Sequence, residues 1–154
     1  LARFTDWLEQ QSGVPGKYED YIVRSSKNAY EVEHIWANHY DRFADVFDQK
    51  GDFDRTRNHI GGLLLLPKKI NASRSDMTYE EKLPHYLKAN ALTQSLHEAF
   101  YDKNPGFRQT LQKHGLKFKP LDEFGLPEMK KRSKLYSKLA ALIWSPDRLL
   151  GEDA

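Results

Sequence analysis

Glu33 and His34 place a carboxylate and an imidazole side by side, and the amide of Asn71 follows later in the chain. Magnesium-type cations prefer oxygen ligands and keep several waters, so one carboxylate and one amide oxygen can suffice as protein ligands. A neighbouring histidine has an ordinary pKa of about 6.5, which leaves it largely neutral at physiological pH and able to take a proton from water. The three residues therefore suggest a compact metal site that hydrolyses phosphodiester bonds.

This interpretation sets a geometric condition on the strand that carries the pair. Residues 30–36 alternate between apolar or aromatic and acidic side chains, which predicts a strand. Adjacent side chains of a regular strand point to opposite faces, so Glu33 and His34 converge only where the strand ends or twists. Residues 36–39 are expected to form such an irregular exit.

Periodicity and turn residues predict the other elements of the first half. They are a short helix around residues 4–8 that ends at Ser12 and Gly13, a helix over 39–47, a turn at Gly51 and Asp52, and a buried strand over 63–66. The run from Thr78 to Glu81 matches a capping box and predicts a helix start. Pro84 is expected to kink that helix or to begin the next one.

The rest of the chain is predicted to be helical. One apolar stripe comprises Leu87, Leu92, Leu96 and Phe100, and it ends at the turn of residues 104–106. A second stripe comprises Tyr136, Leu139, Ala140 and Ile143, with lysines on another face of the same helix. The pattern predicts two strands and a helix that carry the site, surrounded by additional helices.

Three segments together resemble the HNH, or ββα-metal, nucleases. Glu33-His34-Ile35 is similar to their first motif, residues 60–66 (IGGLLLL) to their second, and residues 71–76 (NASRSD) with Tyr79 and Lys82 to their third. The chain is most similar to the C-terminal nuclease domain of GmrSD-type modification-dependent restriction enzymes, in which this domain follows a ParB-like nucleotide-binding domain. The motif core covers about residues 30–86.

The resemblance implies a role for each matched residue. His34 would be the general base, and Glu33 and Asn71 would hold Mg²⁺ or Mn²⁺. The middle asparagine of the second motif is replaced by Gly62, which keeps the backbone carbonyl that orients the histidine and loses the side-chain brace. The proline of the first motif is replaced by Ala37. We expect the Gly62 carbonyl to accept a hydrogen bond from the His34 ring.

Composition is that of a 154-residue domain with little net charge. The chain has 24 basic and 22 acidic residues and no cysteine, which excludes disulfides and thiolate zinc sites. No apolar stretch approaches 18 residues, so no membrane span is expected. We expect a cytoplasmic location. With a net charge of only +2, affinity for DNA must come from local patches. The candidate phosphate contacts are Lys68, Lys69, Arg74 and Lys82, and Lys82 has a competing structural role as a helical partner of the acidic turn of residues 78–81.

The sequence thus predicts an α+β fold, mostly helical, with a small ββα-metal core embedded in several additional helices. We expect residues 1–154 to form one nuclease domain, the C-terminal fragment of a longer protein, that cuts foreign or modified DNA. Two alternatives stay open: a catalytically inactive DNA-binding module, and a helical structural or partner-binding domain. The target of the DNA recognition and the oligomeric state are not encoded in any motif of this chain.

Overall fold

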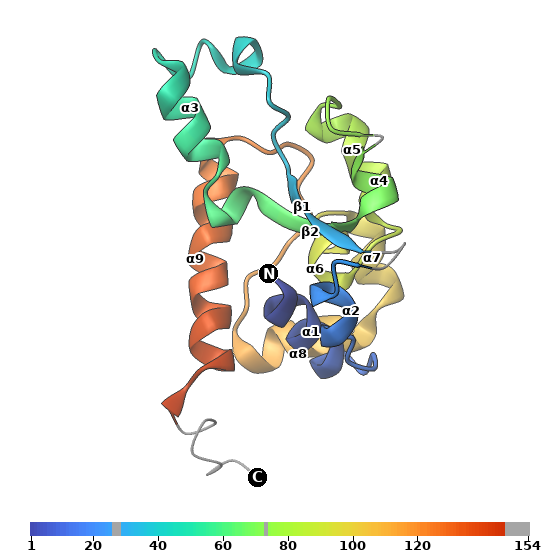
Figure 1. Ribbon diagram of the computed structural model, residues 1–154. Helices are drawn as coiled ribbons and strands as arrows, with labels where there is room; N and C mark the ends of the chain where they lie inside the picture. The colour runs from blue at the N-terminus through green and yellow to red at the C-terminus, as the bar shows by residue number, and fades with distance from the viewer. Residues whose placement is uncertain (26–28, 73, 147–154) are drawn as a thin grey trace.

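The computed structural model describes residues 1–25, 29–72 and 74–146. Most of this part of the chain is helical, and a two-stranded antiparallel sheet lies among the helices (Figure 1). The predicted α+β class, mostly helical, is therefore confirmed. Ser73 of the third motif lies outside the described residues.

The sheet pairs β1 (Tyr30–His34) with β2 (Leu63–Pro67), and the register places His34 opposite Leu63. Both strands were expected at these places. Leu64, Leu65 and Leu66 are buried along the middle of β2, which explains its continuous apolar sequence. β1 ends at His34, so the ladder stays regular up to the candidate base.

The segment between the strands differs from the prediction. The helix expected over residues 39–47 is only a 3₁₀ turn, η1 (Tyr40–Phe43), and the expected turn at Gly51 and Asp52 lies inside helix α3 (Lys50–Arg57). The physical reason is Phe53, which is fully buried and packs against the rings of Trp36 and Phe43. Packing of this aromatic cluster outweighs the weak helix propensity of one glycine.

The second and third motifs form a 3₁₀ turn, η2 (Ile60–Gly62), then β2, then the short helix α4 (Lys68–Ala72) and helix α5 (Tyr79–Tyr86). The predicted capping box is present: the Thr78 hydroxyl accepts from the backbone of Glu81, whose carboxylate accepts from the backbone of Thr78. Pro84 lies within α5.

The remaining helices surround this core. They are α1 (Ala2–Gln11), α2 (Tyr18–Ile22), α6 (Ala91–Gln94), α7 (Glu98–Lys103), α8 (Pro105–His114) and α9 (Leu126–Ile143). The stripe expected from Leu87 to Phe100 does not form one helix: Leu92 lies in α6, Phe100 in α7 and Leu96 between them, and all three are buried. None of the described helices is long and apolar enough to cross a membrane.

Helix α9 joins two apolar clusters. Met129, near its start, packs with the sheet and the aromatic side chains of α3, whereas Tyr136 and Leu139 pack with α1, α6 and α8. The ribbon shows α9 running along one side of the molecule from α3 down to the level of α8 (Figure 1). The first half of this helix also packs on η2, where Gly61 leaves room for the backbone of Met129 and Ser133.

Candidate active site

His34 stands at the end of β1, and its ring meets the amide of Asn58. The imidazole Nε2 lies 2.8 Å from Asn58 Oδ1. Asn58 directly follows α3, and its own Nδ2 donates to the backbone carbonyl of Asp54 at 2.8 Å. A carbonyl oxygen only accepts, so the amide must turn its NH₂ group toward Asp54 and its oxygen toward His34.

This pair of hydrogen bonds selects one tautomer of His34. Because Asn58 Oδ1 is an acceptor, Nε2 must carry the proton of the neutral ring, and Nδ1 keeps its lone pair. Nδ1 receives no hydrogen bond from the described residues. The arrangement that a general base needs is therefore present in the ring.

The electrostatic surroundings keep His34 neutral. Partial burial lowers the pKa of the imidazole below its ordinary value, and the positive charge of Arg57 adds to this lowering. The hydrogen bond to Asn58 and the charge of Glu33 act in the opposite direction. The Arg57 Nε donates to the backbone carbonyl of Trp36 at 2.9 Å, so this guanidinium is fixed beside the candidate base.

Glu33 points away from His34, into the interior. The Lys82 ammonium lies 2.7 Å from Glu33 Oε1, and the hydroxyl of Tyr86 donates to the same oxygen at 3.3 Å. Lys82 Nζ also donates to the backbone carbonyls of His34 and Ile35, at 2.8 and 3.3 Å. The irregular strand exit expected to bring Glu33 and His34 together does not do so: they leave opposite faces of β1.

Asn71, in α4, lies on the Glu33 face of β1 but contacts a different carboxylate. Its Nδ2 donates to Glu31 Oε2 at 3.4 Å. In this arrangement Glu33 and Asn71 do not fit a divalent ion, because an ammonium and a hydroxyl already occupy Glu33. Among the described residues no group of three or more His, Cys, Asp or Glu is placed to hold a metal.

Gly62 contacts the chain next to His34 through its backbone. Its carbonyl accepts from the N–H of Ile35 at 2.9 Å, which fixes the chain immediately after His34. In the structure, the hydrogen-bond partner of the His34 ring is Asn58, so the bond expected from the ring to the Gly62 carbonyl is replaced by one to a side chain. A β-carbon at Gly62 would meet Met129 Cε at 2.9 Å, the end of a flexible side chain.

The four candidate phosphate contacts divide into two groups. Lys68 and Lys69 are exposed on α4, where Lys68 Nζ lies 3.8 Å from Glu31, and Arg74 donates to the carbonyl of Ile70. Lys82 differs from them, because its side chain is only 1% exposed and its ammonium is held in the interior. Lys82 therefore has a structural role, but its partners are Glu33 and two carbonyls of the chain after β1 rather than the acidic turn of residues 78–81 that was expected.

Two residues of this site carry no recognisable signal in the sequence. Asn58 and Arg57 reach the end of β1 from more than twenty residues away, through the packing of α3. Only knowledge of how α3 packs beside β1 could have indicated Asn58 and Arg57, and the sequence did not predict α3.

A family model described as "GmrSD restriction endonucleases, C-terminal domain" matches residues 8–139, which is most of the chain. No curated protein and no solved structure matches it.

Proposed function

Because the chain belongs to the family of GmrSD restriction endonuclease C-terminal domains, we propose that it is a nuclease that hydrolyses DNA phosphodiester bonds with His34 as the general base. The observation that carries this proposal is the His34–Asn58 hydrogen bond, which leaves Nδ1 of a neutral ring as the proton acceptor.

The proposed hydrolysis begins with proton transfer to the His34 ring. Nδ1 of His34 takes a proton from a water molecule, and the resulting hydroxide attacks the phosphorus while the P–O bond to the leaving oxygen breaks; the released alkoxide takes a proton from solvent water. Proton transfer of this kind typically contributes about 10²–10⁴-fold in rate. The Arg57 guanidinium retains donors beyond the one bound to Trp36, and it supplies positive charge beside the reacting phosphate.

DNA contacts away from the reacting phosphate are proposed for Lys68, Lys69 and Arg74. Cationic side chains supply most of the non-specific affinity for DNA and position the strand without reading its sequence. Lys82 is not part of this proposal, because its buried ammonium is already bound by Glu33 and by the carbonyls of His34 and Ile35. Recognition of modified DNA is proposed to require a further domain, of the ParB-like kind that the resemblance implies.

We propose that a divalent metal, Mg²⁺ or Mn²⁺, binds in a second arrangement of the site, in which Lys82 has moved away from Glu33. The metal would stabilise charge on the phosphate and the leaving oxygen. Glu33 and Asn71 supply the hard oxygens that such an ion prefers, but Glu33 binds it only after Lys82 withdraws.

Nicking of supercoiled plasmid by the purified chain with Mg²⁺ or Mn²⁺ tests the nuclease. We expect His34→Ala to abolish nicking while DNA affinity stays within about twofold. His85→Ala, a histidine substitution on α5 outside the site, is the matched control and should cut normally. Cleavage by His34→Ala at the wild-type rate under excess metal would exclude the assignment.

The second candidate is a DNA-binding module without catalysis. The neutralisation of Glu33 by Lys82 favours it, because a candidate metal ligand is then used for structure. This module predicts salt-dependent DNA binding with no nicking by the wild-type chain under either metal, so the plasmid assay separates the two functions.

A further inference from the structure

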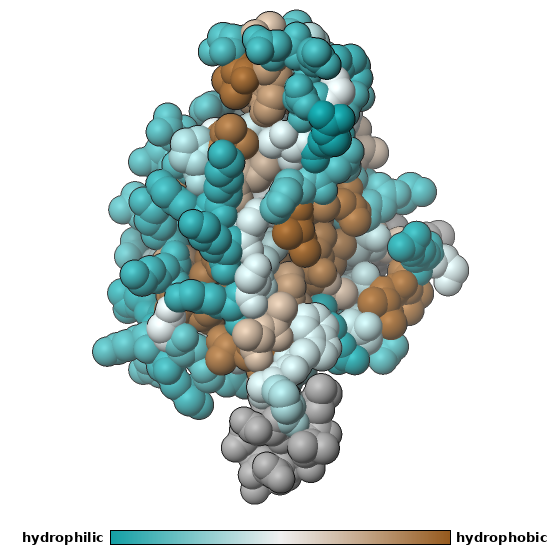
Figure 2. All heavy atoms as spheres, turned by 90° about the vertical axis from the view of Figure 1, so that its left-hand side faces the viewer, coloured by the Kyte–Doolittle hydropathy of each residue, from teal (hydrophilic) through white to brown (hydrophobic). Residues whose placement is uncertain are grey.

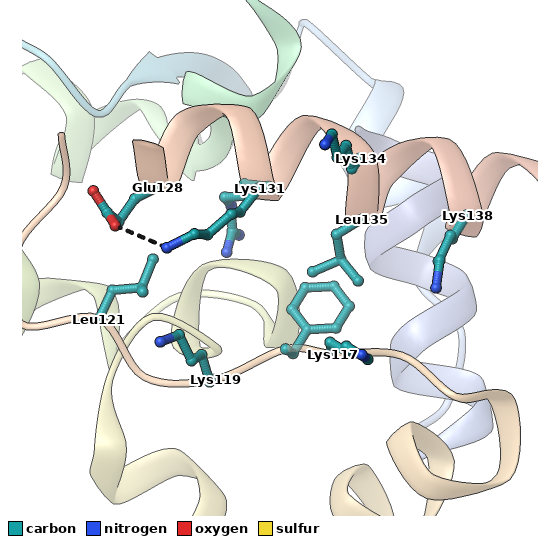
Figure 3. Close-up of a pocket in the computed structure, with 10 residues that line it drawn as sticks. Lys117, Lys119, Leu121, Glu128, Lys131, Lys134, Leu135 and Lys138 are labelled. Atoms are coloured by element: carbon teal, nitrogen blue, oxygen red, sulfur yellow. Dashed lines mark hydrogen bonds and ion pairs between the residues drawn. The ribbon is translucent and has the colours of Figure 1, made fainter. Parts of the chain in front are cut away.

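A groove beside α9 is lined by cations and by a few apolar side chains. It lies between α9 and the segment that leads into it, and it has a volume of about 420 Å³. We call it the α9 groove, and its lining residues are Lys117, Phe118, Lys119, Leu121, Glu128, Lys131, Arg132, Lys134, Leu135 and Lys138. Lys131 and Leu135 extend into it from α9, and Lys119 and Leu121 face them from the opposite wall (Figure 3).

Arg132 is a buried cation of this groove without a counter-ion. Its side chain donates from Nη2 to the carbonyl of Leu92 at 2.8 Å and from Nε to the hydroxyl of Tyr136 at 2.9 Å, and the residue is only 4% exposed. No carboxylate of the described residues lies within ion-pair distance of it. Burial of a charge without an opposite charge costs free energy, and an anion in the groove would offset that cost.

The lysines around Arg132 also lack acidic partners. Lys117, Lys119, Lys134 and Lys138 are exposed and form no ion pair with any described residue. The one lining carboxylate, Glu128, accepts from the backbone N–H of Gly125 at 3.2 Å and lies 3.5 Å from Lys131. On this side of the molecule hydrophilic side chains dominate and smaller hydrophobic areas lie between them (Figure 2).

The apolar side chains of the groove indicate that its ligand also has an apolar part. Leu121 lines the groove together with the small exposed parts of Phe118 and Leu135, which are 7% and 9% exposed, and Arg132 lies over the Phe118 ring at 5.9 Å. An inorganic anion would use the cations and leave this apolar surface in water. A phosphate joined to a flat, largely apolar group uses both features.

We propose that the α9 groove binds a nucleotide, with its phosphate on Arg132 and the lysines and its base over Phe118, Leu121 and Leu135. The nucleotide is either free or the terminal unit of a DNA strand, since both present the same chemistry. This site goes beyond the nuclease function and does not depend on it, because the His34 site contributes no residue to the groove.

Calorimetric titration in EDTA with dAMP, inorganic phosphate and deoxyadenosine as separate probes tests the proposal. We expect dAMP to bind at least about tenfold more tightly than either of the others, because only dAMP uses both the cations and the apolar side chains. Equal affinity for dAMP and phosphate would overturn the nucleotide assignment, and so would the absence of dAMP binding.

Charge variants locate the binding. Lys134→Gln/Lys138→Gln should weaken dAMP binding by about tenfold or more. Lys88→Gln/Lys130→Gln removes the same charge from exposed lysines outside the groove, one of them on α9, and should change it less than about twofold. Equal losses in both double variants would show a diffuse positive surface, contrary to a site. Arg132 is left unchanged because its core hydrogen bonds confound a substitution.

Competition distinguishes the two sources of the nucleotide. A 5′-phosphorylated ten-nucleotide single strand that displaces dAMP identifies a strand end, and failure to displace it identifies the free nucleotide; either supports the site. A hexaglutamate peptide should not displace dAMP. Displacement by this peptide as efficient as by the phosphorylated strand would overturn the proposal in favour of a general polyanion surface.

Discussion

Lys82 Nζ lies 2.7 Å from Glu33 Oε1, and the two side chains are only 1% and 5% exposed. Burial lowers the pKa of Lys82, and the charge of Glu33 opposes this change. The pair joins α5 to the end of β1, where the Lys82 ammonium also donates hydrogen bonds to the carbonyls of His34 and Ile35. A residue that the motif pattern assigns to metal binding therefore stabilises the strand that carries the candidate base.

Lys82→Met should destabilise the protein strongly. The substitution leaves the Glu33 carboxylate buried without a countercharge, which typically costs about 3–5 kcal/mol. Adding Glu33→Met should recover part of that loss. Recovery will be incomplete, because the carbonyls of His34 and Ile35 still lack their donor. Urea denaturation of both single variants and the double variant measures the coupling, and additive effects would contradict it.

A metal should rescue Lys82→Met if Glu33 can act as a ligand. Without the competing ammonium, Mn²⁺ at Glu33 and Asn71 supplies the missing positive charge, and ligand binding to the folded state raises its stability. We expect Mn²⁺ to raise the Tm of Lys82→Met and to leave Glu33→Met/Lys82→Met unchanged, as followed by circular dichroism. An identical response of the two variants would exclude Glu33 as a ligand.

Asn58→Ala should lower kcat by about tenfold while the fold is kept, because Asn58 is exposed and acts through one hydrogen bond to His34. Long-range ¹H–¹⁵N spectra report the tautomer directly: the wild-type ring should be protonated at Nε2, and the variant should show a mixture. Asn38→Ala, another exposed asparagine, is the control. A wild-type ring already mixed between tautomers would remove the role given to Asn58, whatever the activity.

Activity should fall at acid pH through a single group. Burial and Arg57 hold the pKa of His34 below its ordinary value of about 6.5. The base acts when neutral, so kcat/KM should be constant above that value and fall as pH drops through the lowered pKa. Asn58→Asp places a carboxylate beside the ring and should move the fall to higher pH. A profile that still rises well above pH 7 would point to another base.

The two glycines of the second motif should differ in how well they tolerate substitution. A β-carbon at Gly61 would collide with the backbone oxygen of Met129 and with Ser133, so Gly61→Ala should cost about 1–3 kcal/mol. A β-carbon at Gly62 comes too close only to the movable Met129 methyl, and the Arg57 carbonyl lies at an ordinary 3.5 Å, so Gly62→Asn should keep or raise activity; neither glycine has positive φ. Thermal unfolding and plasmid nicking give both values. A larger stability loss for Gly62→Asn than for Gly61→Ala would reverse this ranking.

Local signals accounted for much of the fold. The alternation in β1, the apolar run of β2 and the capping box at Thr78 depend on neighbours in sequence, and all three were found where expected. Helix α3 was missed because Phe53 specifies it through contacts with distant rings. The same limit applies to the site: no local pattern shows that Glu33 faces Lys82 or that His34 meets Asn58.

The position of α9 has a consequence for the protein during its own synthesis. Its Met129 and Ser133 lie against Gly61, and the indole of Trp36 donates to the carbonyl of Phe124, 88 residues later. Contacts so distant in sequence form late, after the intervening chain exists. A nascent chain that stops before residue 124 thus lacks the support of η2 and of Trp36, two residues after His34. We expect such unfinished chains to lack the proposed nuclease activity, which would then arise only after translation has passed α9.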